Sequence, residues 1–372
     1  MEDKLTVIMK ITDSCNLSCK HCYEGKIARK KNFFMSDAVL EKSIQLIQAN
    51  YKFVKYSWFG GEPMTVGIEF FQRAVHFQQK YNAGNIIGNS IQTNGTLLNL
   101  DWINFISDNK FNLSVSYDAQ FNDVLRQQTA LVEKNLNLLR RHEKPFNILC
   151  TVHSKNYQHM IEMYELLKKY KCGLKFNPTF PSGNAVDNSE YLIDPEFFAQ
   201  KLYKFFCYWL GDADAAPVSN FIHYVKLFLK MPGRACIYSG CLYKMLEIEP
   251  DGAVMPCSRY SDNSYVISNI NDSASIQEIF DSEKYKNLVR KSITRRKICK
   301  EQCALYEYCL GGCTSAAFNE GGVENNHYRL CRITKALFPK IFANLSARLA
   351  ESKIVNPIFS QLLKRAKNYP QP

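Results

Sequence analysis

Short β-rich runs alternate with helical stretches at a regular interval from residue 4 to about residue 180. This alternation is typical of a parallel sheet or barrel in which a helix follows each strand. The six predicted strands are Leu5–Thr12, Val54–Phe59, Ile87–Thr93, Asn112–Tyr117, Phe146–His153 and Gly173–Asn177. The helical stretches between them include Ser36–Ala49, capped by Ser36 or Asp37, and Asp101–Asp108. Six strands suggest an α/β fold with an incomplete barrel.

The pattern breaks at Phe180–Asp194, which is rich in turn formers and precedes another helical segment. We expect a domain boundary near Met231–Gly233, after which cysteines crowd together. Leu246–Glu249 and Ala253–Met255 are predicted to form a tight hairpin. The last part, about Lys335–Leu363, is predicted to be helical and basic. The expected organisation is a barrel over 1–230, a small cysteine-rich domain over 231–345, and a helical tail over 346–372.

The chain carries 14 cysteines in 372 residues. Its first residues alternate like a strand and lack the layout of a signal peptide, and no apolar run approaches the roughly 20 residues of a membrane helix. We therefore expect a cytoplasmic protein without membrane contact, in which cysteines are metal ligands or buried thiols. The net charge of +12 favours an anionic partner such as an acidic peptide or nucleic acid, although a solvated basic surface explains it as well.

Three cysteines follow the first predicted strand directly, in the run Cys15-Asn-Leu-Ser-Cys19-Lys-His-Cys22. They would occupy the loop at the carboxyl end of that strand, where barrels place their chemistry. Thiolates ligate the irons of a [4Fe–4S] cube well, and three of them leave one iron open to an exchangeable ligand. S-adenosylmethionine (SAM) can chelate that iron and, after one-electron reduction, release a 5′-deoxyadenosyl radical. A zinc knuckle or a group of core thiols is the alternative.

The tetrapeptide Gly60-Gly61-Glu62-Pro63 ends the second predicted strand. Its glycines let backbone approach a ligand closely, and its carboxylate can accept hydrogen bonds from an ammonium group, although the tetrapeptide alone could be an ordinary turn. The two motifs, in this order, resemble those of the radical SAM superfamily. The resemblance implies a partial (β/α)6 TIM-like barrel in which Gly60, Gly61, Glu62 and Pro63 lie along the methionine end of SAM.

The resemblance also implies further SAM contacts. His21 would pack near the adenine, although a solvated loop histidine is nearly as good an interpretation. Ser116 matches a position that contacts the ribose, and Lys134 would stand where relatives carry an arginine near the SAM carboxylate.

Eight further cysteines lie beyond the expected boundary, and they make two sets of four. Full thiolate ligation would close two cubane clusters and leave no iron open, which suits electron transfer. Structural zinc sites with four cysteine ligands are the alternative. The eight cysteines are Cys236, Cys241, Cys257, Cys299, Cys303, Cys309, Cys313 and Cys331.

This region resembles the SPASM extension of radical SAM enzymes. The resemblance implies two auxiliary [4Fe–4S] clusters in addition to the SAM cluster, with interleaved ligands. The nearer auxiliary cluster would be held by Cys236, Cys241, Cys257 and Cys313. The farther one would be held by Cys299, Cys303, Cys309 and Cys331. Three cysteines remain, Cys150, Cys172 and Cys207; they lie in apolar stretches and are interpreted as core thiols.

Within the superfamily the chain is most similar to the anaerobic sulfatase maturases, which oxidise a serine or cysteine of a protein to formylglycine. The phrases that carry this likeness are Ser90–Thr96 and Phe146–Cys150. Three positions depart from that subfamily. Ser258 stands where it has an aspartate, the proposed base, Phe59 replaces a glutamine, and its aspartate–glycine pair has become Asp118-Ala119.

The altered pocket points away from sulfatases, so the sequence predicts a peptide maturase that abstracts a side-chain hydrogen and closes a carbon–carbon or thioether crosslink. Asp118 and Asp262 are the candidate bases, unranked. The expected partners are a precursor peptide and an external one-electron donor of the flavodoxin or ferredoxin type. A sulfatase maturase with another base is the first alternative. An RNA-modifying radical SAM enzyme is the second, favoured by the basic runs Arg29–Lys31 and Arg295–Lys297, although no RNA-binding module is recognisable. A non-enzymatic zinc protein is the third.

Overall fold

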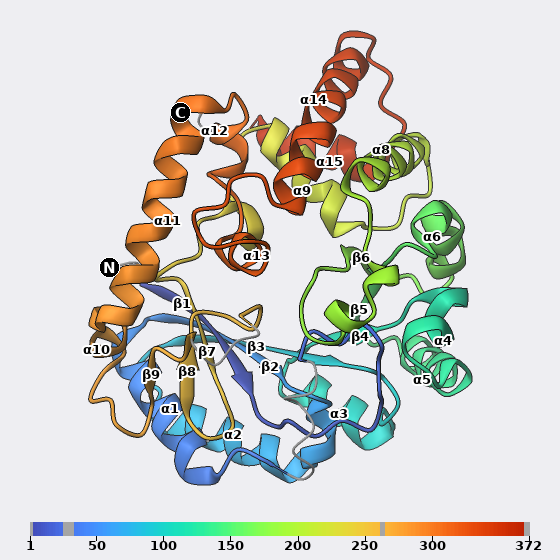
Figure 1. Cartoon of the computed structure of the whole chain (residues 1–372). Coiled ribbons are helices and arrows are strands. Elements are labelled where there is room, and N and C mark those ends of the chain that lie inside the picture. Colours follow the sequence, from blue (N-terminus) through green and yellow to red (C-terminus); the bar gives the residue numbers. More distant parts are fainter. Residues whose placement is uncertain (1–2, 25–32, 261–264, 368–372) are drawn as a thin grey trace.

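The computed structural model describes residues 3–24, 33–260 and 265–367 (Figure 1). Its centre is a run of six parallel strands, ordered along the sheet as they are along the chain. These strands are β1 (Lys4–Lys10), β2 (Phe53–Phe59), β3 (Ile86–Thr93), β4 (Asn112–Ser116), β5 (Phe146–Val152) and β6 (Gly173–Pro178). All six predicted strands are confirmed, and each observed end lies within two residues of the predicted one.

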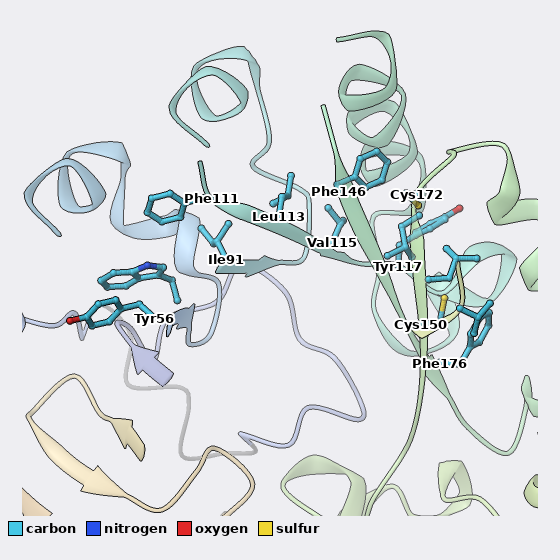
Figure 2. Packing of buried hydrophobic residues seen from close by; sticks show 14 of the residues in the cluster. Tyr56, Ile91, Phe111, Leu113, Val115, Tyr117, Phe146, Cys150, Cys172 and Phe176 are labelled. Atoms are coloured by element: carbon cyan, nitrogen blue, oxygen red, sulfur yellow. The ribbon is translucent and has the colours of Figure 1, made fainter. Parts of the chain in front are cut away.

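Helices between the strands cover the outer face of this partial barrel. They are α1 (Asp37–Asn50), α2 (Ile68–Lys80), α3 (Leu100–Asp108), α4 (Asn122–Leu125), α5 (Thr129–Arg141) and α6 (Met160–Lys168). The hydroxyl of Ser36 caps α1 by accepting from the Val39 backbone N–H at 3.3 Å, so Ser36 is the cap. On the outer face Trp58 packs edge-on against Phe71, with ring centroids 5.6 Å apart. Figure 2 shows this apolar layer, including the buried thiols of Cys150 and Cys172.

The inner face of the strands is polar. Side chains alternate along each strand, so the neighbours of the buried outer residues point inward. Strands that are buried on both faces would read as continuous apolar runs. Here the inner positions are hydroxyl, amide and amino side chains that are half-buried or exposed, among them Lys55, Ser57, Gln92, Ser114 and Lys175. The incomplete barrel therefore presents an accessible polar surface beside its strand ends.

The predicted hairpin is confirmed and extends the same sheet. β7 (Met245–Ile248) pairs antiparallel with β8 (Ala253–Met255), which pairs in turn with β9 (Ser268–Asn269). β7 also pairs parallel with β1, which the sequence did not predict. The cysteine-rich part is thereby joined to the first barrel strand, in one nine-stranded sheet.

The remaining helices lie beyond β6 and β9. They are α7 (Asn184–Asp187), α8 (Pro195–Gly211), α9 (Ser219–Phe228), α10 (Ile276–Asp281), α11 (Glu283–Gln302), α12 (Tyr306–Cys309), α13 (Thr314–Asn319), α14 (Arg329–Ala350) and α15 (Pro357–Ala366). The single helical segment expected after Phe180–Asp194 is two helices, α8 and α9, and α14 packs against both (Figure 1). Since α14 runs across the expected 345/346 limit, the domain division stays a prediction. Within the described ranges no helix is both long and apolar enough to cross a membrane.

Candidate active site

The loop that carries the first three cysteines is held against the loop after β2. The N–H of Gly61 donates to the carbonyl of Thr12 at 2.9 Å, and the N–H of Glu62 donates to that of Ser14 at 2.8 Å. A Cβ added to Gly61 would lie 2.2 Å from the carbonyl oxygen of Ser14, and one added to Gly60 would lie 2.4 Å from that of Thr12. Only glycine fits both positions, so the two motifs found in the sequence form one structural unit.

Glu62 ties this unit to the next strand. Its carboxylate accepts from the N–H of Met64 at 3.0 Å, from the hydroxyl of Thr93 at 2.7 Å and from the N–H of Asn94 at 2.7 Å. Burial raises the pKa of Glu62 to about 7, while these hydrogen bonds lower it. Glu62 was predicted as an acceptor for an ammonium group, but its observed donors belong to the chain itself. Its first role is to fix the loops after β2 and β3.

The turn-rich segment after β6 supports the cysteine loop from another side. The backbone N–H of Asn184 donates to the carbonyl of Cys22 at 2.8 Å, and its side-chain amide donates to that of Cys19 at 3.0 Å. A Cβ on Gly183 would lie 2.3 Å from the carbonyl oxygen of Tyr23. What the sequence presented as a break between elements is therefore part of the site.

The three thiols of the loop share one partly buried space. Burial raises the pKa of Cys15 to about 12, and negative charge on Cys19 and Cys22 would raise it as well. Burial also raises the pKa of Cys19, whereas the guanidinium of Arg126 lowers it. The loop thus brings its three cysteines within electrostatic reach of one another and places a cation beside them.

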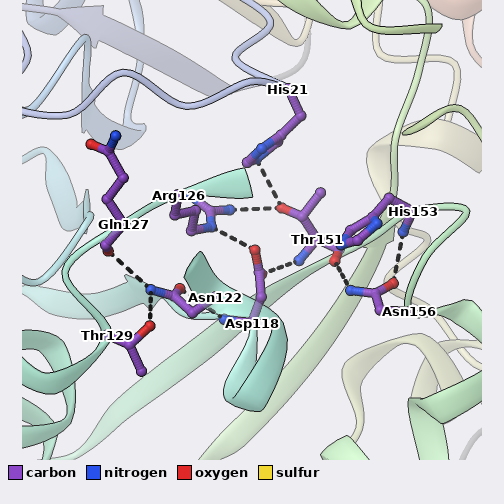
Figure 3. A network of polar contacts seen from close by, with 9 residues as sticks. All are labelled: His21, Asp118, Asn122, Arg126, Gln127, Thr129, Thr151, His153 and Asn156. Carbon is purple, nitrogen blue, oxygen red and sulfur yellow. Dashed lines mark hydrogen bonds and ion pairs between the residues drawn. The ribbon is translucent and has the colours of Figure 1, made fainter. Parts of the chain in front are cut away.

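That cation belongs to a polar network at the ends of β4 and β5 (Figure 3). The Nε of Arg126 donates to Oδ2 of Asp118 at 2.8 Å, and its Nη2 donates to the hydroxyl of Thr151 at 2.6 Å. The same hydroxyl lies 3.2 Å from Nε2 of His21. Burial lowers the pKa of His21 well below its usual value, and the charge of Arg126 lowers it further, so the imidazole is neutral at pH 7. Its Nδ1 is buried without a partner among the described residues.

Asp118 is fully buried in this network and already engaged. Besides the bond to Arg126, its Oδ1 accepts from the N–H of Thr151 at 2.6 Å. A carboxylate held by a guanidinium and a backbone amide serves to orient Arg126, which argues against Asp118 as the base. The other candidate, Asp262, lies outside the described residues.

Two of the predicted SAM contacts occupy different environments. Ser116 ends β4 and is buried two residues before Asp118, at the edge where the network lies. Lys134 is exposed on α5, and the basic side chain beside the cysteine loop is Arg126 instead. Sequence reasoning missed Arg126; the available signal was its position eight residues after Asp118, which follows a strand. All predicted SAM contacts stay predictions.

The departures from the sulfatase-maturase pattern have local consequences. Ala119 has a φ of 51°, in the left-handed region that favours glycine, where a side chain costs about 1 kcal/mol. Phe59 stacks on Tyr23, next to Cys22, with ring centroids 5.6 Å apart. Ser258 is half-buried directly after Cys257.

The cysteines predicted to hold the nearer auxiliary cluster lie within electrostatic reach of one another. Burial raises the pKa of Cys257 well above its usual value, and charge on Cys313 and Cys241 would raise it further. Burial raises the pKa of Cys241 to about 12, with added contributions from Cys313 and Cys236. These four residues come from three separate stretches of chain, and the other three are all neighbours of Cys241.

The second set lines a single cavity of about 180 Å³. Its lining includes all four cysteines of the set, Cys299, Cys303, Cys309 and Cys331. A pocket walled by four cysteines has the donor set of an iron–sulfur cluster. In the described part of the chain no three histidine, cysteine or acidic side chains are arranged around a single metal ion. A larger hollow of about 470 Å³ lies outside the barrel, between α2 and α3.

The basic run Arg295–Lys297 in α11 lies only partly on the surface. Arg295 is fully buried, and its guanidinium donates to the carbonyl of Cys313 at 3.2 Å and to the hydroxyl of Thr314 at 3.3 Å. It fixes the start of α13 and the backbone of a predicted ligand. The other run, Arg29–Lys31, lies outside the described residues.

A cluster of carboxylates around Lys10, which sequence reasoning also missed, lies at the ends of β1 and β7. Its members are Asp13, Glu24, Glu247 and Glu249. Asp13 and Glu24 flank the first cysteine loop, and Glu247 is close enough to Cys257 that its charge would raise the pKa of that thiol. The cluster therefore reaches both cysteine constellations. The alternation of side chains along β1 could have suggested that Lys10 points to the inner face. The pairing of β1 with β7, which brings Glu247 and Glu249 to this lysine, could not be predicted from the sequence.

Two family models match this chain. Residues 9–167 match the radical SAM superfamily, and residues 236–304 match the SPASM iron–sulfur cluster-binding domain. A cysteine-type anaerobic sulfatase-maturating enzyme of Clostridium perfringens is 28% identical over 364 residues, covering 92% of this chain and 97% of the relative. A serine-type enzyme of Klebsiella aerogenes is 26% identical over 358 residues, covering 91% of this chain and 85% of the relative.

Solved structures agree with these matches. The native anSMEcpe enzyme with bound AdoMet superposes with a TM-score of 0.81 at 26% identity, over 92% of this chain and 98% of that one. Streptococcus suis SuiB, solved with its precursor peptide SuiA, shares the fold with a TM-score of 0.64 at 18% identity, over 86% and 74% of the two chains. Together with the paired motifs, these matches show that the chain belongs to the radical SAM superfamily, carries a SPASM iron–sulfur domain, and is an enzyme similar to the anaerobic sulfatase-maturating enzymes.

Proposed function

We propose that this enzyme oxidises a cysteine or serine side chain of a peptide or protein substrate to formylglycine. The observation that carries the proposal is similarity along nearly the whole chain to maturases of both the cysteine and the serine type. A peptide substrate is also supported by anSMEcpe, which has been solved with the Cp18Cys peptide bound and covers 93% of this chain.

Three clusters follow from the cysteine sets. Cys15, Cys19 and Cys22 hold the SAM cluster, and each later set of four holds one auxiliary cluster. The proximity of the thiols within each set and the cavity walled by the second set support this assignment. When bound, the clusters and SAM supply the 5′-deoxyadenosyl radical that abstracts hydrogen and accept the surplus electron. The Gly60–Pro63 turn and the Arg126 network, which both adjoin the first cysteine loop, would help to hold SAM.

Crosslinking, the reaction predicted from the sequence, becomes the second candidate. The observation that favours it is Ser258, because a neutral hydroxyl cannot replace the aspartate base of the sulfatase maturases. The likeness to SuiB adds little, since 18% identity supports the common fold alone. Oxidation stands first because the carboxylates around Lys10 offer another candidate for the base.

The proposal is tested with the Cp18Cys peptide. Reconstituted, reduced enzyme is incubated with SAM and this peptide, and the product is examined by mass spectrometry. We expect 5′-deoxyadenosine together with the aldehyde-bearing peptide. If 5′-deoxyadenosine forms and the peptide is recovered unchanged or internally linked, the oxidation proposal is wrong. A Ser258→Asp variant serves as the comparison, because gain of aldehyde in that variant alone would favour crosslinking as the native reaction.

The farther auxiliary cluster is expected to act after SAM cleavage. Replacing Cys309 with alanine should reduce finished product more than 5′-deoxyadenosine, because the thiol ligates the cluster that carries the electron away. Both yields are measured in the same reaction. The matched control is Cys207→Ala, since Cys207 is half-buried between α8 and α14 and belongs to neither set. Full product yield from the Cys309 variant would contradict an electron-transfer role.

A further inference from the structure

Lys10 holds three carboxylates at the end of the first strand. Its Nζ lies 2.6 Å from Oε2 of Glu24, 2.8 Å from Oε2 of Glu249 and 3.1 Å from Oδ1 of Asp13. The lysine side chain is only 5% exposed, so the charges meet in a space largely shielded from water. One ammonium group therefore balances at most one of the three carboxylates.

Glu247 adds a fourth carboxylate on the same inner face. It pairs in register with Ile8 on β1, and its residue surface is only 2% exposed. Among the described residues its Oε1 has no hydrogen-bond partner. Burial raises the pKa of Glu247 well above its usual value, and the charges of Glu249 and Glu24 raise it further. Besides burial, the uncompensated negative charge of this cluster raises the pKa of both Glu247 and Glu249.

Glu249 is the most exposed carboxylate of those that pair with Lys10. It follows β7 directly, where Ile248 pairs with Met9 on the buried outer face, so Glu249 and Lys10 both point to the inner face. Its side chain is 17% exposed, against 9% for Glu24 and 11% for Asp13. Burial raises its pKa to about 7, while Lys10 lowers it and the charges of Glu24 and Asp13 raise it. A carboxylate with this pKa is ionised and protonated in comparable amounts at neutral pH, which suits a general base.

We propose that Glu249 is the catalytic base of this enzyme and takes the place of the aspartate that Ser258 has replaced. The assignment rests on the proposed oxidation. That reaction removes two electrons and two protons from the substrate carbon and its hydroxyl or thiol. One hydrogen atom leaves with the 5′-deoxyadenosyl radical, one electron goes to an iron–sulfur cluster, and the remaining proton passes from the substrate oxygen or sulfur to Glu249. The new double bond is C=O for serine; for cysteine it is C=S, which water converts to the aldehyde with release of hydrogen sulfide. Lys10 orients the carboxylate of Glu249, and Glu247 is a second carboxyl group nearby that can hold a proton.

The test compares Glu249→Gln with Glu24→Gln in the reconstituted holoenzyme, using the Cp18Cys peptide. Both substitutions remove a carboxylate that pairs with Lys10, so a purely structural role predicts similar effects. We expect Glu249→Gln alone to lower aldehyde formed per 5′-deoxyadenosine by about 100-fold, the usual size of a lost general base. In the unmodified enzyme this ratio should rise as pH increases through about 7, because the base must be ionised. The Glu249→Gln variant should lack that inflection.

A second readout is independent of turnover. Infrared difference spectra of the holoenzyme, recorded across the same pH range, should show carboxyl absorption that titrates near pH 7; Glu62 also contributes to it, and the Glu249 contribution should be missing from Glu249→Gln. Equal aldehyde ratios in the unmodified enzyme and Glu249→Gln, or carboxyl absorption of undiminished intensity in this variant, would overturn the base assignment while leaving the oxidation proposal intact. No aldehyde from an unmodified enzyme that still cleaves SAM would instead overturn the oxidation proposal, and the assignment with it.

Discussion

Replacing Cys15, Cys19 and Cys22 together with alanine is expected to remove about four of about twelve irons and to abolish SAM cleavage, since three cubanes of four irons follow from the ligand sets. The effect is large because the open iron that binds SAM exists only in the cluster with three thiolate ligands. Iron is measured after anaerobic reconstitution, and 5′-deoxyadenosine by chromatography. An unchanged rate of 5′-deoxyadenosine formation in the triple variant would rule out these three cysteines as the SAM-cluster ligands.

The control for this experiment uses a thiol outside the three sets. Cys207→Ala should keep the full iron content and the full rate of SAM cleavage. A loss of about four irons there as well would mean that reconstitution, and not ligation, limits the iron count. The eight later cysteines stay intact in the triple variant, so the remaining iron, about eight atoms, should persist.

Much of the fold could be predicted because its signals are local. Hydrophobic periodicity located every strand of the barrel, and the pair Ser36 and Asp37 marked the start of α1, where the structure shows that Ser36 is the cap. The pairing of β7 with β1 could not be predicted, because nothing in Met245–Ile248 states which strand edge it will join. The same limit applies to α8 and α9. The sequence predicts one helical segment there, whereas the structure has two helices separated by a turn.

The site divides in the same way. Cysteine spacing and the Gly60–Pro63 turn are contiguous motifs, so the sequence shows them directly. Arg126 and Glu249 are single residues whose meaning comes from partners far along the chain: Thr151 for the first and Lys10 for the second. A single sequence gives no reason to choose Arg126 and Glu249 over other charged residues. Lys134 was predicted from the resemblance to relatives that carry an arginine there, and it is exposed on α5.

Removing Asp118 is expected to cost the folded protein about 3–5 kcal/mol, the usual effect of leaving one member of a buried ion pair unpaired. Its carboxylate is completely buried, and the guanidinium of Arg126, 12% exposed, would lose the carboxylate with which it pairs. The backbone N–H of Thr151 would lose its acceptor as well. Denaturant unfolding of reconstituted Asp118→Ala, compared with the unmodified enzyme, measures the loss.

The matched control is Lys134→Ala, which removes an exposed charge from α5 and should change stability by no more than about 0.5 kcal/mol. A double variant separates the two possible reasons for a loss. In Asp118→Ala combined with Arg126→Met no unpaired buried charge remains, so part of the stability should return, whereas SAM cleavage should not, because the cation beside Cys19 is gone. If Asp118→Ala alone is as stable as the unmodified enzyme, the pair is not the buried anchor inferred from its geometry, and Asp118 returns as a candidate base.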